Sequence, residues 1–180
     1  MEIPIIHTQR LVLRGLDPLD LDYLHSILSD REVIRYLPRT EPWPIAIVQK
    51  WIESQQNQWD EYGFGWWAVE HQKSGELIGW SGLNHIVESD EDEVLYLFAK
   101  PYWGRGIATE AAKASVEYGF GVVGLDEIIG LTHPENFQSQ RVLEKCGLEF
   151  INMAQYFGME LRRYRISLKK YRKWIVDQGG

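Results

Sequence analysis

The first third of the chain changes from alternating to helical hydrophobic spacing. Residues 10–16 (RLVLRGL) alternate apolar and polar side chains, as a half-buried strand does. Asp17 and Pro18 then combine a helix cap with a first-turn proline, and apolar residues recur on one helical face after them. A second amphipathic helix is predicted from about Pro44 to Trp59. We therefore expect a strand followed by two helices.

The rest of the chain alternates between strand and helix patterns. Three apolar β segments are separated by short polar stretches, which is typical of an antiparallel meander. A helix, a strand, a second helix and two strands then follow. The predicted strands cover residues 65–71, 76–83, 93–99, 127–133, 148–151 and 164–168, and the predicted helices begin near Gly106 and cover about 137–146, where Gly147 forms a left-handed cap. This order predicts an α/β (α+β) fold.

Composition limits the class of protein. The chain has 180 residues, 44% of them hydrophobic, which suits one globular domain over residues 1–180. A formal charge of -7 argues against nucleic acid or anionic lipid as the main partner. A single cysteine, Cys146, excludes an internal disulfide or a multi-cysteine metal site. Neither a signal peptide nor an apolar run long enough to cross a bilayer occurs, so we expect a cytoplasmic protein that binds no membrane and no metal.

Two glycines flank Arg105 between a buried strand and a helix. The segment Gly104-Arg105-Gly106 offers main-chain N–H groups at the positive end of a helix dipole, which is a favourable anion site. A tight turn that needs positive φ is the structural alternative. Other phosphate loops are excluded, because the chain has no GxxxxGK[ST] segment and Thr109 occupies the third glycine position of a GxGxxG pattern.

Four segments carry separately spaced motifs: residues 8–14 (TQRLVLR), 75–80 (GELIGW), 103–108 (WGRGIA) and 133–147 (HPENFQSQRVLEKCG). In this order they resemble the GCN5-related N-acetyltransferases (GNAT), and within them the branch that acetylates the N-termini of ribosomal proteins (RimJ/RimL-like). In the family's Q/R-x-x-G-x-G/A loop, Trp103 stands where Gln or Arg is usual. We expect this substitution to remove a polar group that would help to hold the loop.

The resemblance implies a fold and a cosubstrate. The GNAT fold is a mixed, mostly antiparallel sheet flanked by helices, and it is splayed into a V between the strands ending near Phe98 and Thr132. Acetyl-CoA would lie in the V, with its pantetheine arm against Asn136 and against main-chain groups of Leu97, Phe98 and Ala99. Its pyrophosphate would bind the N–H groups of Gly104, Arg105, Gly106, Ile107, Ala108 and Thr109. Whether the Arg105 side chain contributes charge stays open, and Asn136 is also a good helix cap.

Acyl transfer to an amine requires a neutral amine, a polarised thioester carbonyl and a stabilised leaving thiolate. We expect main-chain N–H groups near Phe98 to polarise the carbonyl. The resemblance places Ser139 near the sulfur, where it would hydrogen-bond the thiolate; a purely structural helix serine is the alternative. For the general base the sequence offers Glu93 and His85, and both also suit a solvated strand end.

The sequence offers only weak candidates for a general base. This favours an acceptor that needs little help to lose its proton, such as an N-terminal α-amine. An α-amine has a pKa of about 7.7–8.0 and is partly neutral at pH 7, whereas a lysine amine, with a pKa of about 10.4, costs roughly 4 kcal/mol to deprotonate. A small amine (antibiotic, polyamine or amino acid) is the alternative acceptor, and a non-catalytic acyl-CoA-binding module is the alternative function.

Three further segments bear on the acceptor and on assembly. Trp43 lies between two prolines and is predicted at the acceptor mouth. The acidic run at residues 88–93 either attracts polycations or forms a solvated hairpin loop, and we favour the loop. Residues 168–176 (LKKYRKWIV) resemble a helix through which a homodimer could form.

Overall fold

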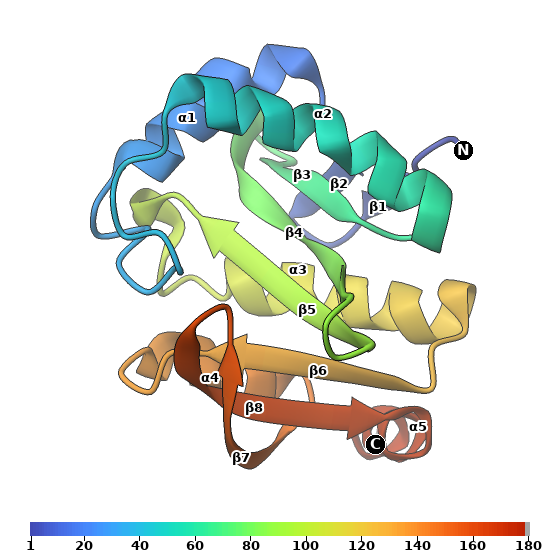
Figure 1. Cartoon of the computed structure of the whole chain (residues 1–180). Coiled ribbons are helices and arrows are strands. Elements are labelled where there is room, and N and C mark those ends of the chain that lie inside the picture. The colour runs from blue at the N-terminus through green and yellow to red at the C-terminus, as the bar shows by residue number, and fades with distance from the viewer. Residues whose placement is uncertain (179–180) are drawn as a thin grey trace.

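An eight-stranded sheet forms the centre of the structure, a computed structural model that describes residues 1–178 (Figure 1). Residues 179 and 180 of the predicted domain lie outside the described residues. The strand order is β1-β2-β3-β4-β5-β6-β8-β7, and neighbours are antiparallel except β5 with β6. The strands are β1 (Ile6–His7), β2 (Leu11–Gly15), β3 (Trp66–His71), β4 (Glu76–Ile86), β5 (Glu91–Phe98), β6 (Glu127–Thr132), β7 (Glu149–Tyr156) and β8 (Met159–Ser167).

Helices cover both faces of the sheet (Figure 1). Helices α1 (Leu21–Ser29) and α2 (Ile45–Tyr62) pack on one face around buried Trp80, whereas α3 (Ile107–Tyr118) and α4 (Phe137–Lys145) pack on the other around Tyr164. The short segments are η1 (Pro18–Asp20), η2 (Lys100–Tyr102) and η3 (Gly119–Val123). No helix within residues 1–178 is both long and apolar enough to cross a membrane.

The sheet opens between β5 and β6. These parallel strands pair at one position only, Glu93 opposite Ile129, and they diverge toward Phe98 and Thr132 (Figure 1). On its other side β5 pairs with β4 along its length from Glu91 to Phe98. One edge of β5 is therefore open toward its carboxyl end, and the predicted mixed sheet splayed into a V is confirmed.

Two segments differ from their predicted form. The hairpin of β7 and β8 is longer than predicted, since its strands cover Glu149–Tyr156 and Met159–Ser167. Its turn was hard to predict, because Phe157 has φ 54° and a phenylalanine is rarely found in that left-handed region. The prediction of a solvated loop is wrong for Glu91 and Asp92, which begin β5. Glu91 accepts hydrogen bonds from Tyr156 and Arg163 of the hairpin.

The C-terminal segment forms α5 (Leu168–Gln178) and packs on its own chain. Tyr171 is buried and stacks on Phe120, with ring centroids 4.6 Å apart. Trp174 lies over Gly147, where an added Cβ would meet its ring at 3.0 Å. Tyr171 and Trp174 of the predicted dimer helix thus pack against residues of their own chain.

Candidate active site

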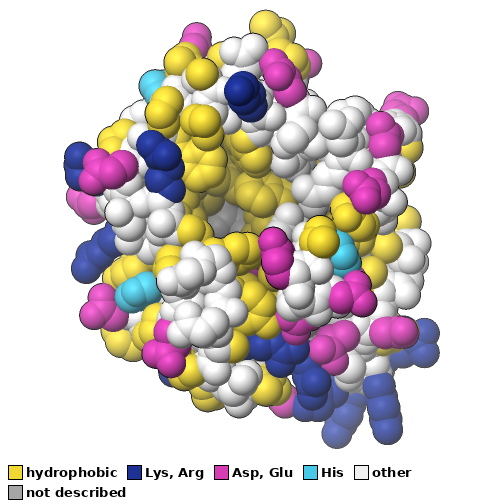
Figure 2. All heavy atoms as spheres, viewed as in Figure 1, with side chains coloured by type: hydrophobic (Ala, Val, Ile, Leu, Met, Phe, Trp, Pro, Cys, Tyr) yellow, Lys and Arg dark blue, Asp and Glu magenta, His cyan; other side chains and the backbone are white. Residues whose placement is uncertain are grey.

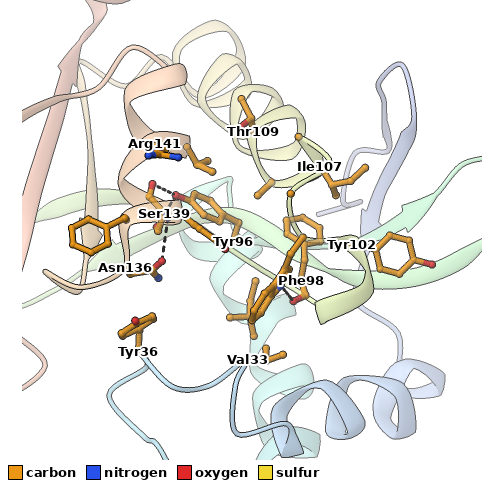
Figure 3. A pocket seen from close by; sticks show the side chains of 18 of the residues that line it. Val33, Tyr36, Tyr96, Phe98, Tyr102, Ile107, Thr109, Asn136, Ser139 and Arg141 are labelled. Carbon is orange, nitrogen blue, oxygen red and sulfur yellow. Dashed lines mark hydrogen bonds between the residues drawn. The ribbon is translucent and has the colours of Figure 1, made fainter.

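A cavity of about 610 Å³ occupies the open end of the V (Figure 3). Its walls come from the end of β5, the loop before α3, the first turns of α3 and α4, and the loop between α1 and α2. Nine residues predicted to serve the site line it: Leu97, Phe98, Gly104, Gly106, Ile107, Ala108, Thr109, Asn136 and Ser139. Ala99, Arg105, Glu93, His85 and Trp43 lie outside this lining.

The loop between β5 and α3 ends in an uncapped helix. Gly104 and Gly106 have φ of 71° and 75°, in the region that favours glycine. Gly106 is the N-cap of α3, and no side chain caps the helix there. The N–H groups of the first turn of an α-helix have no partner within the helix, and here Ile107, Ala108 and Thr109 line the cavity. The helix N-terminus is therefore available to an anion.

The first sequence motif holds this loop through Glu110. The Glu110 carboxylate accepts hydrogen bonds at 2.7 Å from Thr8 Oγ1, from Arg10 N and from Arg10 Nε. The Arg10 guanidinium also donates to the Arg105 carbonyl at 2.8 Å. Burial would raise the pKa of Glu110, but the hydrogen bonds from Thr8 and Arg10 outweigh it and lower that pKa. Residues 8–10 thus link β2 to the loop before α3.

Trp103 stands in place of the usual Gln or Arg and supplies a hydrogen-bond donor itself. Its indole N–H donates to the Phe98 carbonyl at 2.7 Å, and its ring packs against both hydrophobic clusters. The prediction that the substitution removes a polar group is therefore wrong. The Arg105 side chain instead lies over the Tyr102 ring, 5.9 Å from the centroid.

The main chain of Phe98 faces the open side of β5. Ala99 N–H donates to Ile78 O of β4 at 2.9 Å, so this N–H is not free for a ligand. Main-chain groups alternate in direction along an antiparallel strand, so those of Phe98 point away from β4. The bond from Trp103 to the Phe98 carbonyl has the same direction. Of the three residues predicted to pair with pantetheine, Phe98 is the one whose N–H faces the V.

Ser139 is held by two neighbours (Figure 3). Asn136 caps α4 by accepting a hydrogen bond from Ser139 N at 3.1 Å. Tyr96 of β5, which sequence reasoning missed, places its hydroxyl 2.9 Å from Ser139 Oγ and donates to Ser139 O at 3.1 Å. Burial raises the pKa of Tyr96, so the phenol stays protonated. In an apolar strand a tyrosine is typical of a core position, and only the fold brings it to α4.

Two basic side chains of α4 were also missed. Arg141 and Lys145 line the cavity at i and i+4, on one face of the helix. The spacing of these two cations was a signal in the sequence. The P-x-N-x-x-S motif, however, includes only Asn136 and Ser139. Together with the α3 N-terminus, these cations make the cavity suitable for an anionic ligand.

The α1–α2 loop bridges the cavity. Tyr36 stacks on His133 with ring centroids 5.0 Å apart, and its hydroxyl donates to Glu135 O at 3.3 Å. Tyr36 also lines the cavity beside Asn136 (Figure 3). Contacts between residues 99 positions apart in the chain therefore close one side of the V.

Glu93 lies at the apex of the V, where β5 meets β6. Its side chain is 8% exposed, and neither a hydrogen bond nor an ion pair to it is found within residues 1–178. Burial, and then the nearby Glu91 carboxylate, raises the pKa of Glu93 to about 8. Strand alternation puts it on the α1/α2 face with Leu95 and Leu97.

The other two candidates are engaged elsewhere. His85 Nδ1 lies 2.9 Å from Asp92 Oδ1, and its ring stacks on Tyr62 at 4.6 Å. Because Asp92 precedes Glu93 in the strand, the pair lies on the opposite face from Glu93. Trp43 is half-buried in the cluster under α1 and α2 and lies outside the cavity lining.

Comparison with known proteins identifies this arrangement. The acetyltransferase (GNAT) domain family matches residues 10–149. The chain belongs to the GNAT acetyltransferase family. YkkB from Bacillus subtilis is 31% identical over 160 residues, which are 87% of this chain and 92% of YkkB. A solved acetyltransferase from Agrobacterium tumefaciens is 26% identical, with a TM-score of 0.82 over 92% of this chain and 95% of its own. Spermidine N(1)-acetyltransferase from Escherichia coli is 28% identical over 81% of this chain and 75% of its own.

As a GNAT acetyltransferase, the protein uses acetyl-CoA to acetylate an amine. The uncapped α3 and the open edge of β5 fit the anionic and amide groups of this cosubstrate. Within residues 1–178, no group of three or more His, Cys, Asp or Glu side chains is placed to hold a metal ion.

Gly104→Val and Gly104→Asn distinguish the two roles of the loop glycine. An added Cβ at Gly104 meets no protein atom within 4 Å, so any steric conflict comes from the ligand. Asn tolerates positive φ whereas Val does not. We expect both variants to weaken acetyl-CoA binding at least about tenfold by calorimetry, with the melting temperature of Gly104→Asn close to that of the wild type and that of Gly104→Val lowered by its strained φ. Wild-type affinity in Gly104→Asn would mean that the glycine serves the turn alone.

Proposed function

We propose that the protein acetylates the α-amine of a polypeptide N-terminus by direct attack on acetyl-CoA in a ternary complex, as in the RimJ/RimL-like branch. One observation carries this proposal: Glu93 is buried at the apex of the V, beside the open edge of β5, and no ion pair or hydrogen bond to its side chain is found within residues 1–178. It gives the chain a base for an amine of moderate pKa, next to the groups that would hold the thioester.

The cosubstrate would supply an activated acetyl group as a thioester. The N–H groups from Gly104 to Thr109 bind its pyrophosphate, and Arg141 and Lys145 add positive charge on the α4 side. The Phe98 N–H donates to the thioester carbonyl oxygen and favours the negative charge that develops there during attack. Trp103 and Ile78 fix the next peptide group from both sides, which keeps this donor in place.

Glu93 accepts the proton that the attacking amine must lose. A carboxylate with a pKa near 8 is a stronger base than an ordinary glutamate, and it matches an α-amine, whose pKa is about 7.7–8.0. A lysine amine, with a pKa of about 10.4, is almost wholly protonated at pH 7, whereas an α-amine is already partly neutral there. This difference supports an α-amine as the acceptor.

Ser139 stabilises the leaving thiolate with its hydroxyl. Tyr96 holds that hydroxyl at 2.9 Å and is too weak an acid to lose its own proton. Tyr96 is thus a positioning residue, and it acts through Ser139. Trp43 contributes to the hydrophobic cluster beneath the acceptor side.

A small polyamine is the second candidate acceptor. Its support is the similarity to a spermidine N(1)-acetyltransferase at 28% identity. The two candidates differ in charge, because a polyamine carries several amines whereas a peptide N-terminus carries one.

Release of CoA thiol tests the function with a peptide that has a free N-terminus, the same peptide acetylated at its N-terminus but containing lysine, and spermidine. We expect turnover with the free N-terminus, because Glu93 can deprotonate an α-amine near neutral pH. Turnover confined to the lysine peptide or to spermidine would contradict the proposed acceptor.

The pH dependence of that assay tests Glu93. Glu93 must lose its proton to act, and so must the α-amine, so kcat/KM should rise with two ionisations below about pH 8. In Glu93→Gln one ionisation should remain, with kcat/KM lowered about 100-fold and acetyl-CoA affinity kept. Asp92→Asn, which changes the neighbouring carboxylate on the opposite face, should keep both ionisations. Two ionisations in Glu93→Gln would exclude it as the base.

A double-mutant cycle tests the pair of Tyr96 and Ser139. Ser139→Ala should lower kcat about three- to tenfold, the effect of one neutral hydrogen bond. Tyr96→Phe should lower kcat with little change in KM for acetyl-CoA, and it should add nothing in the Ser139→Ala background. Independent, multiplicative effects of the two substitutions would show that Tyr96 does not act through Ser139.

A further inference from the structure

Tryptophan rings form a wall on the α1/α2 face of the sheet. Trp51 of α2 lies 5.3 Å from Trp66 of β3 and 5.0 Å from Trp80 of β4, measured between ring centroids. Trp51 and Trp66 are only half-buried, as are Leu95 and Leu97 of the neighbouring β5. Figure 2 shows a hollow at the centre of this side of the molecule, walled mainly by hydrophobic side chains.

No polar contact fixes the indole groups of this wall. The N–H groups of Trp51 and Trp66 are buried and have no hydrogen-bond partner within residues 1–178. Because these N–H groups are buried, the surface that the two rings offer to a ligand is apolar and aromatic. Glu93 lies on the same face of β5 as Leu95, two residues before it, so the wall continues to the carboxylate that takes the acceptor's proton.

The charged side chains around Glu93 favour a ligand with a single positive charge. Glu91 is paired with Arg163, and Glu127 lies 3.8 Å from Arg163 and 3.5 Å from Arg165. Arg165 lies across Ile129 from Glu93, because Ile129 is paired with both residues. Glu93 is thus the one carboxylate at this face of β5 that no cation of the described residues neutralises. On this face of the sheet, a second amine of a polyamine placed beyond Glu93 toward β8 would meet Arg165.

We infer that the acceptor is a singly charged primary amine attached to a large apolar or aromatic group, which on a polypeptide is an N-terminal residue such as Leu, Met or Phe. The tryptophan wall receives this side chain, and Glu93 receives the proton of the amine beside it. The inference rests on the proposed function and narrows its substrate. Peptides that begin with Ser or Ala should be poorer acceptors, because their small side chains leave the wall uncovered.

Three peptides that differ only in the first residue, Phe, Leu or Ser, test the inference together with spermidine. CoA release should give kcat/KM at least about tenfold higher for the Phe and Leu peptides than for the Ser peptide, since each buries a large apolar side chain. Spermidine should be the poorest acceptor. Trp66→Ala should reduce the Phe-to-Ser ratio toward one, whereas Trp174→Ala, which removes a half-buried indole on α5, should keep the wild-type ratio.

The melting profile of Trp66→Ala is the control for folding. Leu95→Thr gives the same readout in a variant that introduces a β-branched residue, which suits a strand. Equal or greater activity with the Ser peptide would overturn the apolar wall as an acceptor site while leaving an N-terminal acceptor in place. Preference for spermidine would overturn both the wall and the proposed α-amine. Absence of turnover with any peptide would overturn the proposed function itself.

Discussion

The separation of β5 from β6 is the constraint on which the rest of the site depends. One pairing, Glu93 with Ile129, joins β5 to β6, and beyond it the edge of β5 that faces away from β4 has no strand to pair with. The N–H and C=O groups of an unpaired strand edge can hydrogen-bond a ligand that offers alternating amide groups. The same divergence leaves Glu93 buried at the apex and opens a cavity of about 610 Å³ toward the ends of the two strands. The proposed base, the proposed carbonyl donor and the cavity thus all depend on one irregularity of the sheet.

Contacts distant in sequence keep this opening in shape. Glu110 joins the start of β2 to α3, Trp103 joins the phosphate loop to the end of β5, and Tyr36 crosses from the α1–α2 loop to His133. Each contact uses a side chain to fix a main-chain segment that has no regular partner. The loop glycines, which the protein itself leaves uncrowded, are then free to receive a phosphate group.

Most of the fold could be predicted from the sequence, because hydrophobic period and turn residues act locally. The loop at Gly104 and Gly106 and the cap at Asn136 were predictable for the same reason. Tyr96 and Trp103 were not, since their roles depend on Ser139 and Phe98, which only the tertiary fold brings near them. Glu93 and His85 were indistinguishable in sequence. Strand alternation places them on opposite faces, and burial raises the pKa of Glu93 to about 8, whereas His85 contacts Asp92.

The most direct test of the central claim is a crystal structure of the chain with acetyl-CoA bound. The account predicts the pyrophosphate at the N-terminus of α3, the thioester carbonyl oxygen within hydrogen-bonding distance of Phe98 N–H, and the sulfur beside the Ser139 hydroxyl. The acetyl group should then lie on the side of β5 where Glu93 is buried. A cofactor bound outside the V, or a thioester that leaves Phe98 N–H without a partner, would contradict the account.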